Sequence, residues 1–253
     1  TLGIKTASYP NLIFTDADCK PASKNWIRRI SECYSDQTEF VLGYAPYEKK
    51  WTVLNLFIQY ETIYTAMQYL GRAALGKPYM GIGRNLSYSR ELFFRKKGFA
   101  KHLHVISGDD DLLVNAWANK ENTEICLHPE SFVYSSAKKG FSEWMNQKKR
   151  HLYSGKFYKK STRNTLFIYW LFAVLAYLSS IFPVILKPEY YLSYLPLAVF
   201  ILISFLFISL LASRFKVMHL LAFLIPLDII YQFIYTPLLS LLVLFKKRMN
   251  VWS

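Results

Sequence analysis

Cysteine is scarce in this 253-residue chain, and its few cysteines do not form a recognisable motif. Cys19, Cys33 and Cys126 are far apart and odd in number, and no two of them make a Cys-x-x-Cys pair. The sequence therefore predicts neither a disulfide framework nor a structural zinc site. A reducing compartment is the simpler interpretation.

Acidic residues are also scarce, with 17 Asp and Glu against 31 Lys and Arg, which gives a net charge of +14. Such an excess predicts an anionic partner, either nucleic acid or a membrane surface. Residues 138–163 contain nine Lys and Arg but one acid, Glu143, directly before the first long apolar segment. Basic residues at that place are typical of the cytoplasmic side of a membrane protein, and no nucleic-acid-binding motif accompanies them. We therefore predict a membrane partner and no nucleic acid.

Charged residues nearly disappear after residue 163, where three long apolar segments follow. Segments 165–186 and 190–212 contain no charged residue, and each is long enough to span a bilayer. Segment 220–245 contains Pro226, Asp228 and Pro237, a pattern typical of a kinked span or a re-entrant element. Its length favours a crossing.

The change in composition divides the chain into two parts. Residues 1–163 are expected to form an α/β domain, and residues 164–253 a membrane domain with two to three transmembrane helices. A basic, amphipathic helix near 141–152 is expected to lie at the membrane interface. No secretory signal precedes the first strand. The first residue is Thr1, whereas a natural chain would start with Met, so we expect a piece of a longer protein.

Residue patterns predict several elements in the first part. A short apolar run at 12–14 is typical of a strand buried on both faces, and 39–44 predicts another strand. A long amphipathic helix is expected over 52–75 and a short helix over 87–94. Glu61 and Gln68 interrupt the apolar stripe of the long helix, either as partly solvated residues or as substrate contacts.

Two carboxylates, Asp16 and Asp18, follow the first strand directly. The ends of strands are where open α/β sheets bind ligands, and a pair spaced in this way can hold a hard divalent cation. That cation can in turn hold a diphosphate. Surface turns often contain the same pattern, so the spacing alone is weak evidence.

Three consecutive carboxylates, Asp109, Asp110 and Asp111, open a predicted helix. Acids favour the first turn of a helix, where they cap free N–H groups. Three in a row exceed what a cap requires, because adjacent carboxylates repel one another. The repulsion raises the proton affinity of one of them, which is useful in a general base.

Four motifs in this order resemble the membrane-bound members of glycosyltransferase family 2, inverting enzymes that include the cellulose, chitin and hyaluronan synthases. The motifs are Thr-Asp-Ala-Asp-Cys-Lys-Pro (15–21), Gly-Arg-Asn-Leu-Ser-Tyr (83–88), Gly-Asp-Asp-Asp-Leu (108–112) and Gln-Lys-Lys-Arg-His (147–151), followed by membrane spans. The resemblance covers essentially the whole chain. It implies a partial GT-A domain, which is an α/β, Rossmann-like fold, followed by a transmembrane α-helical region.

The resemblance also implies roles for individual residues. Asp18, supported by Asp16, would bind Mg²⁺ or Mn²⁺ on the diphosphate of a nucleotide sugar, and Asp109 would be the catalytic base. Two positions depart from the family pattern, with Gly108 in place of Glu and His151 in place of Trp. The residues expected to contact the donor diphosphate or the acceptor are Asp16, Asp18, Asn85, Asp111, Gln147 and Arg150.

The implied function is that of a metal-dependent hexosyltransferase in polysaccharide or glycolipid biosynthesis. It would move a sugar from a nucleotide-sugar donor, with a UDP-sugar expected, to a lipid-linked or growing glycan acceptor. It would be a multi-pass protein of the cell membrane with its catalytic domain facing the cytoplasm. Strands of the family's donor pocket would precede Thr1, so we expect an unpaired sheet edge and little activity from residues 1–253 alone. The alternative is a non-catalytic membrane protein whose basic helix binds anionic lipid or a partner.

Overall fold

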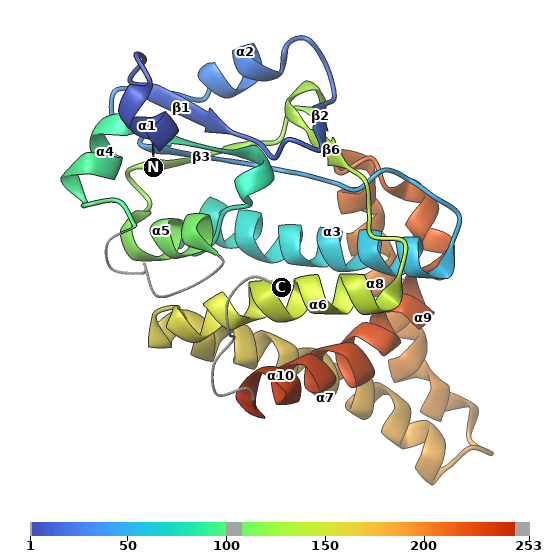
Figure 1. The fold of residues 1–253 in the computed structure, drawn as a ribbon. Helices are drawn as coiled ribbons and strands as arrows, with labels where there is room; N and C mark the ends of the chain where they lie inside the picture. Colours follow the sequence, from blue (N-terminus) through green and yellow to red (C-terminus); the bar gives the residue numbers. More distant parts are fainter. Residues whose placement is uncertain (1, 100–107, 246–253) are drawn as a thin grey trace. The chain divides into compact units, whose positions relative to one another are not determined.

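The structure of the protein, a computed structural model, describes residues 2–99 and 108–245 (Figure 1). These residues form two compact units. The first ends at Lys159, and the second runs from Lys160 to Phe245.

A four-stranded mixed sheet forms the centre of the first unit, in the order β1-β4-β3-β5. β4 is antiparallel to both of its neighbours, whereas β3 and β5 are parallel. Two further strands, β2 and β6, pair antiparallel with Cys19 opposite Ser135. The strands are β1 (Asn11–Phe14), β2 (Cys19–Pro21), β3 (Phe40–Gly43), β4 (Leu86–Ser89), β5 (Thr123–Cys126) and β6 (Val133–Ser135).

Strand β4 corrects the prediction of a helix over 87–94. Only the second half of that segment is helical, as α4 (Arg90–Arg95), which Ser89 caps by accepting a hydrogen bond from Leu92 N at 3.2 Å. Ser87 is buried in the strand, where its hydroxyl contacts Tyr34 Oη at 2.6 Å and donates to Leu12 O at 2.7 Å. Pairing with strands on both sides overrides the local pattern of these four residues.

Strand β1 lies at one edge of the described sheet and is half-buried. Its register places Phe14 opposite Leu86, and the Phe14 ring stacks on Tyr88 with 4.4 Å between centroids. The expectation of a strand buried on both faces is therefore wrong for the described residues. An edge strand has a neighbour on one side only, which leaves part of its surface exposed.

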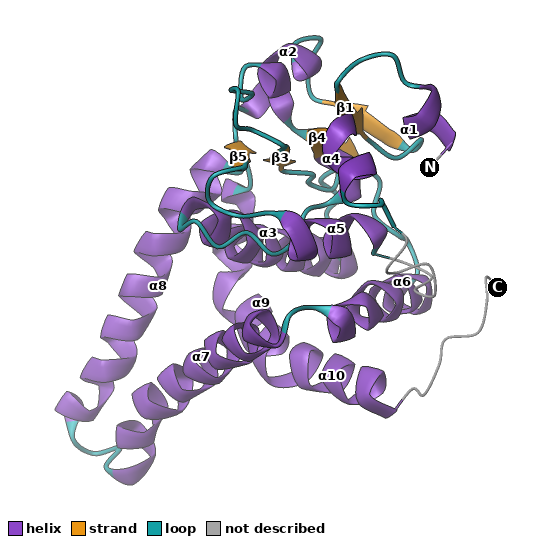
Figure 2. Cartoon of the chain, turned by 90° about the vertical axis from the view of Figure 1, so that its left-hand side faces the viewer, coloured by secondary structure: helices purple, strands orange, loops and turns teal. Residues whose placement is uncertain are grey.

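Helices cover both faces of this sheet. Figure 1 and Figure 2 show α2 on one face and α3 with α5 on the other, with α6 beyond α3. The helices of this unit are α1 (Leu2–Thr6), α2 (Trp26–Ser31), α3 (Val53–Ala74), α4, α5 (Asp109–Trp117) and α6 (Phe141–Ser154), with short 3₁₀ turns η1 (Gly83–Asn85), η3 (Pro129–Ser131) and η4 (Gly155–Phe157).

Helix α3 confirms the prediction over 52–75. It begins after Thr52, whose hydroxyl accepts a hydrogen bond from Asn55 N at 3.2 Å. Every residue from Asn55 to Ile63 is buried, so the helix is covered on all sides rather than along one stripe. Tyr69 Oη donates to Gly43 O at 2.7 Å and ties the helix to β3. Each large side chain buried in this way contributes roughly 1.5–3 kcal/mol.

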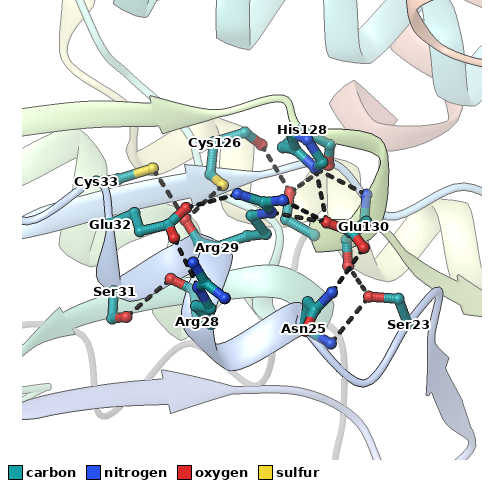
Figure 3. Close-up of polar contacts among 11 residues, drawn as sticks. Ser23, Asn25, Arg28, Arg29, Ser31, Glu32, Cys33, Cys126, His128 and Glu130 are labelled. Carbon is teal, nitrogen blue, oxygen red and sulfur yellow. Dashed lines mark hydrogen bonds and ion pairs between the residues drawn. The ribbon is translucent and has the colours of Figure 1, made fainter.

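A polar cluster fixes α2 against η3, as Figure 3 shows. The Glu130 carboxylate accepts hydrogen bonds at 2.7 Å from Asn25 Nδ2 and from Arg29 Nε. These two partners lower the pKa of Glu130. Together with the β2–β6 pairing, the cluster holds the chain that follows Asp16 and Asp18.

The second unit contains three helical segments that are each long and apolar enough to cross a membrane. Helices α7 (Lys160–Leu186) and α8 (Leu195–Arg214) meet at the turn η5 (Tyr191–Tyr194), as Figure 2 shows. In the most apolar part of the segment Tyr191–Arg214, 6% of the residues are buried. Such exposed apolar surface suits a lipid environment.

The third apolar segment is helical throughout its described length, through η6 (Met218–Phe223), α9 (Leu224–Ile229), the π-helical turn η7 (Ile230–Tyr235) and α10 (Thr236–Phe245). Its acidic residue, Asp228, accepts hydrogen bonds from Tyr177 Oη of α7 at 2.5 Å and from Gln232 Nε2 at 3.0 Å. The carboxylate is thus bonded within the helical unit, as expected for a charged residue in a span.

Candidate active site

A cavity of about 290 Å³ in the first unit brings together side chains from segments that are far apart in the sequence. Several of the predicted site residues line it, together with others that sequence reasoning missed. A larger hollow of about 500 Å³ along α7 is lined by apolar side chains and one serine, and so offers no comparable chemistry. The residues that line the smaller cavity are Asp16, Tyr47, Glu61, Thr62, Thr65, Met80, Ile82, Gly83, Arg84, Gly108, Asp110, Asp111, Gln147, Lys148 and His151.

The Asp-x-Asp motif lies in the turn between β1 and β2. Cys19 N donates to Asp16 O at 3.1 Å and closes the turn. One ligand atom from each of Asp16, Asp18 and Cys19 lies within 4.8 Å of the others. Mg²⁺ and Mn²⁺ prefer carboxylate oxygens, whereas a thiol is a soft ligand. The residues present therefore fit a hard divalent cation held by Asp16 and Asp18.

The side chain of Asn85 is not available to a ligand. It is 1% exposed, and its Nδ2 donates to Tyr44 O at 2.9 Å and to Ser131 O at 2.8 Å. Its Oδ1 accepts a hydrogen bond from Trp26 Nε1 at 3.1 Å. The amide holds three segments of the fold together, because buried polar groups need partners. At the position where the sequence predicts a contact with the diphosphate or the acceptor, the structure shows an amide bonded to protein partners.

The three carboxylates at the start of α5 do not face the same way. Asp109 is exposed and is not among the residues that line the cavity, whereas Asp110 and Asp111 are. Successive helical side chains are about 100° apart, so three neighbours do not share one face. The residue before them, Gly108, has φ of +87° and lies against Ser154 of α6. Within the described residues, Asp110 and Asp111 thus line the cavity and Asp109 does not, and the role of Asp109 as the catalytic base stays a prediction.

Burial shifts the protonation of the two cavity carboxylates. Burial first, and then the charges of Asp109 and Asp16, raise the pKa of Asp110 to about 6. Burial and the charge of Asp110 raise the pKa of Asp111 to about 8, although a hydrogen bond with Tyr158 lowers it in part. At pH 7 Asp110 is therefore mostly ionised and Asp111 mostly protonated. A carboxylate with a pKa just below the working pH is suited to accept a proton.

Helix α6 contributes Gln147, Lys148 and His151 to the cavity. Gln147 and His151 are four residues apart, which places them on the same helix face one turn apart. Arg150 is exposed and does not line the cavity. Of the two residues predicted to lie near the diphosphate or the acceptor, Gln147 lines the cavity and Arg150 does not, and their binding roles stay predictions.

A buried ion pair crosses the cavity wall. Lys148 Nζ of α6 contacts Glu61 Oε2 of α3, and their side chains are 12% and 9% exposed. Glu61 thus lines the cavity, but its carboxylate is paired with the ammonium group of Lys148. Of the two open interpretations of Glu61, partial solvation is wrong, because the side chain is buried and paired.

Arg84 and Tyr47 are functional candidates that sequence reasoning missed. The Arg84 guanidinium carbon lies 4.3 Å from the centre of the Tyr47 ring, in a cation–π contact. The one available signal was that Arg84 lies within the Gly-Arg-Asn motif. That Tyr47 is its partner could not be read from the sequence, because the two residues are joined only by the fold.

Comparison with known proteins gives a family match and a solved structure of similar fold. Residues 41–245 match the model of a family described as glycosyl transferase family group 2. No curated protein matches the chain. Among solved structures, the chain is similar to the mannosyltransferase PcManGT from Pyrobaculum calidifontis, solved in complex with GDP-Man and Mn²⁺, at 13% identity and a TM-score of 0.44. That match covers 92% of this chain, which spans 65% of the length of the other protein.

Proposed function

We propose that this chain, which belongs to the glycosyl transferase family group 2, transfers a sugar with inversion from a nucleotide-sugar donor to a lipid-linked or growing glycan acceptor. One observation carries the proposal. Asp16 of the Asp-x-Asp motif, Asp110 of α5 and Gln147 of α6 line a single cavity although more than 30 residues separate each from the next. A binding module for lipid has no need of this combination of carboxylates inside a cavity.

Asp110 is the proposed general base. A carboxylate oxygen of Asp110 accepts the proton of the acceptor hydroxyl while that oxygen attacks the anomeric carbon of the donor sugar. The bond between the anomeric carbon and the diphosphate oxygen breaks, and the nucleoside diphosphate leaves with the electron pair. A single displacement inverts the anomeric centre, so no carboxylate nucleophile is required.

Asp16 and Asp18 are the proposed ligands for Mg²⁺ or Mn²⁺. A divalent cation bound there would neutralise charge on the departing diphosphate. Asp111, which is mostly protonated at pH 7, is proposed to donate a hydrogen bond to the donor or the acceptor. Gln147 offers an amide for the same purpose.

The three apolar helices support a proposed location in the cell membrane as a multi-pass protein. The basic residues of 138–163 favour a catalytic domain on the cytoplasmic side. The catalytic domain would then bind its nucleotide sugar from the cytoplasm. A UDP-sugar is the proposed donor.

The test is an assay of the complete protein in lipid nanodiscs with radiolabelled UDP-sugars and GDP-sugars and a membrane extract as acceptor source. Transfer of label that requires Mg²⁺ or Mn²⁺ is expected. Asp110→Asn should lower turnover by roughly 100-fold to 10,000-fold, whereas Asp109→Asn should lower it by less than tenfold. Unchanged turnover in Asp110→Asn contradicts the assigned base, and no consumption of any nucleotide sugar contradicts the proposed function.

A further inference from the structure

Arg84 lines the cavity and makes no ion pair with the residues that the structure describes. Its atom Nη1 is buried and has no hydrogen-bond partner among the residues that the structure describes. Within the same residues, no carboxylate lies within 4.0 Å of the guanidinium. A buried N–H donor is costly to leave unpaired, so this arrangement indicates a partner from outside the chain.

The other cations near the cavity are already used or lie outside it. Lys148 is paired with Glu61, and Arg150 is exposed away from the cavity. Desolvation and the neighbouring positive charges lower the pKa of His151, so this imidazole is neutral at pH 7. Arg84 is therefore the described cation that is positioned to receive an anion in this cavity.

Arg84 is held in place from both sides. Its neighbour Asn85 is fixed by three hydrogen bonds, and its guanidinium rests on the ring of Tyr47. Tyr47 is 7% exposed and pairs through its backbone with Ser135. Ser135 also pairs with Cys19, the residue after Asp18. The Tyr47 residue that contacts Arg84 is thus joined through Ser135 to β2, which begins directly after Asp18.

We propose that Arg84 binds a phosphate oxyanion of the substrate, in the place that the family pattern assigns to the arginine of the last motif. A planar guanidinium stacked on an aromatic ring presents its remaining N–H groups in the fork geometry that suits phosphate oxygens. The inference rests on the proposed function, since the expected source is the diphosphate of the donor. The same chemistry would suit the phosphate of a phosphorylated lipid acceptor.

Arg84→Gln and Arg84→Lys test this role, with Arg72→Gln as a matched control. Arg72 also lies over a tyrosine ring, that of Tyr79 at 5.2 Å, but does not line the cavity. The probes are inorganic pyrophosphate, inorganic phosphate, UDP and GDP, each titrated calorimetrically into the complete protein with Mn²⁺. Thermal unfolding of each variant identifies any general loss of fold.

Arg84→Gln is expected to weaken binding of pyrophosphate and of UDP or GDP by roughly tenfold to 100-fold, with Arg84→Lys in between. Arg72→Gln should bind like the parent protein. If diphosphates are unaffected but inorganic phosphate binding and the KM for acceptor change, then the acceptor phosphate is the ligand. If Arg84→Gln folds and binds all four probes like the parent, or if the parent binds none, the role of Arg84 is refuted.

The proposed function can fail separately. If pyrophosphate binding depends on Arg84 while the parent binds neither UDP nor GDP and transfers no sugar, the phosphate site stands and the glycosyltransferase proposal falls. If the Arg84 variants transfer sugar like the parent, the glycosyltransferase proposal stands and the proposed role of Arg84 falls.

Discussion

The carboxylate of Asp110 lies directly against the backbone of Gly83, so that a Cβ atom at position 83 would overlap Oδ2 of Asp110. This contact joins the first turn of α5 to the turn η1, which carries Arg84. The segment that carries Asp110, the proposed base, and the segment that carries Arg84, the proposed phosphate-binding residue, therefore fix each other's position. Small changes in this contact should affect chemistry more than stability.

Gly83→Ala tests that contact. The added methyl group should displace the Asp110 carboxylate and lower turnover by about 100-fold, since misplacing a catalytic group by about 1 Å has effects of that size. Gly71→Ala is the control, because no atom lies within 4 Å of a Cβ there and the position is an exposed one in α3. It should keep full activity and gain about 0.5–1 kcal/mol in stability. Equal turnover in Gly83→Ala and the parent would place the base elsewhere.

Asp111 should make the protein less stable as the pH rises. An aspartate ionises near pH 4 in an unfolded chain, whereas burial raises the pKa of Asp111 to about 8 in the folded state. Between these values the folded state binds more protons than the unfolded state, so the free energy of unfolding falls with increasing pH. Asp111→Asn should flatten this dependence.

The window between pH 6.5 and 8 lies above the pKa of Asp110, which is about 6, so the difference in slope between the parent and Asp111→Asn reports Asp111. Thermal unfolding across this window should show a steeper decline in the parent than in Asp111→Asn. Asp36→Asn, at an exposed carboxylate, should keep the slope of the parent. Parallel curves for the parent and Asp111→Asn would contradict the prediction.

Metal binding should depend on oxygen ligands and not on the neighbouring thiol. Asp18→Asn is expected to lose Mn²⁺ binding measured by electron paramagnetic resonance, together with metal-dependent binding of UDP or GDP. Cys19→Ser should retain both, since its sulfur is a soft ligand and hydrogen-bonds to Asp18 Oδ1 at 3.6 Å. The opposite ranking of these two variants would show that the thiol is a ligand.

The Glu61–Lys148 pair should stabilise α6 against α3 chiefly because each charge needs the other. Glu61→Gln leaves the Lys148 charge buried without a counter-charge and should cost about 3 kcal/mol, measured from thermal unfolding. Adding Lys148→Met should recover most of that loss. If the double variant is as unstable as the sum of the single ones, the two residues are not coupled.

Sequence patterns predicted those parts of the fold that depend on local physics. The helix over 52–75 has a threonine cap and apolar residues at helical spacing, and the apolar segments are long and nearly free of charge. Strand β4 was missed, because four residues carry too little pattern to distinguish a strand from the start of the helix that follows. Its pairing with β1 and β3 is a tertiary event.

The sequence by itself determined the positions along the chain of the carboxylates, the membrane-length helices and the four motifs, because each consists of residues that are close together in the sequence. The tertiary structure alone decided which of them meet. Asp110 rather than Asp109 lines the cavity, and Arg84 rather than Arg150 brings a guanidinium to it. Neighbours on a helix point in different directions, and only packing against distant segments determines which direction is the inside.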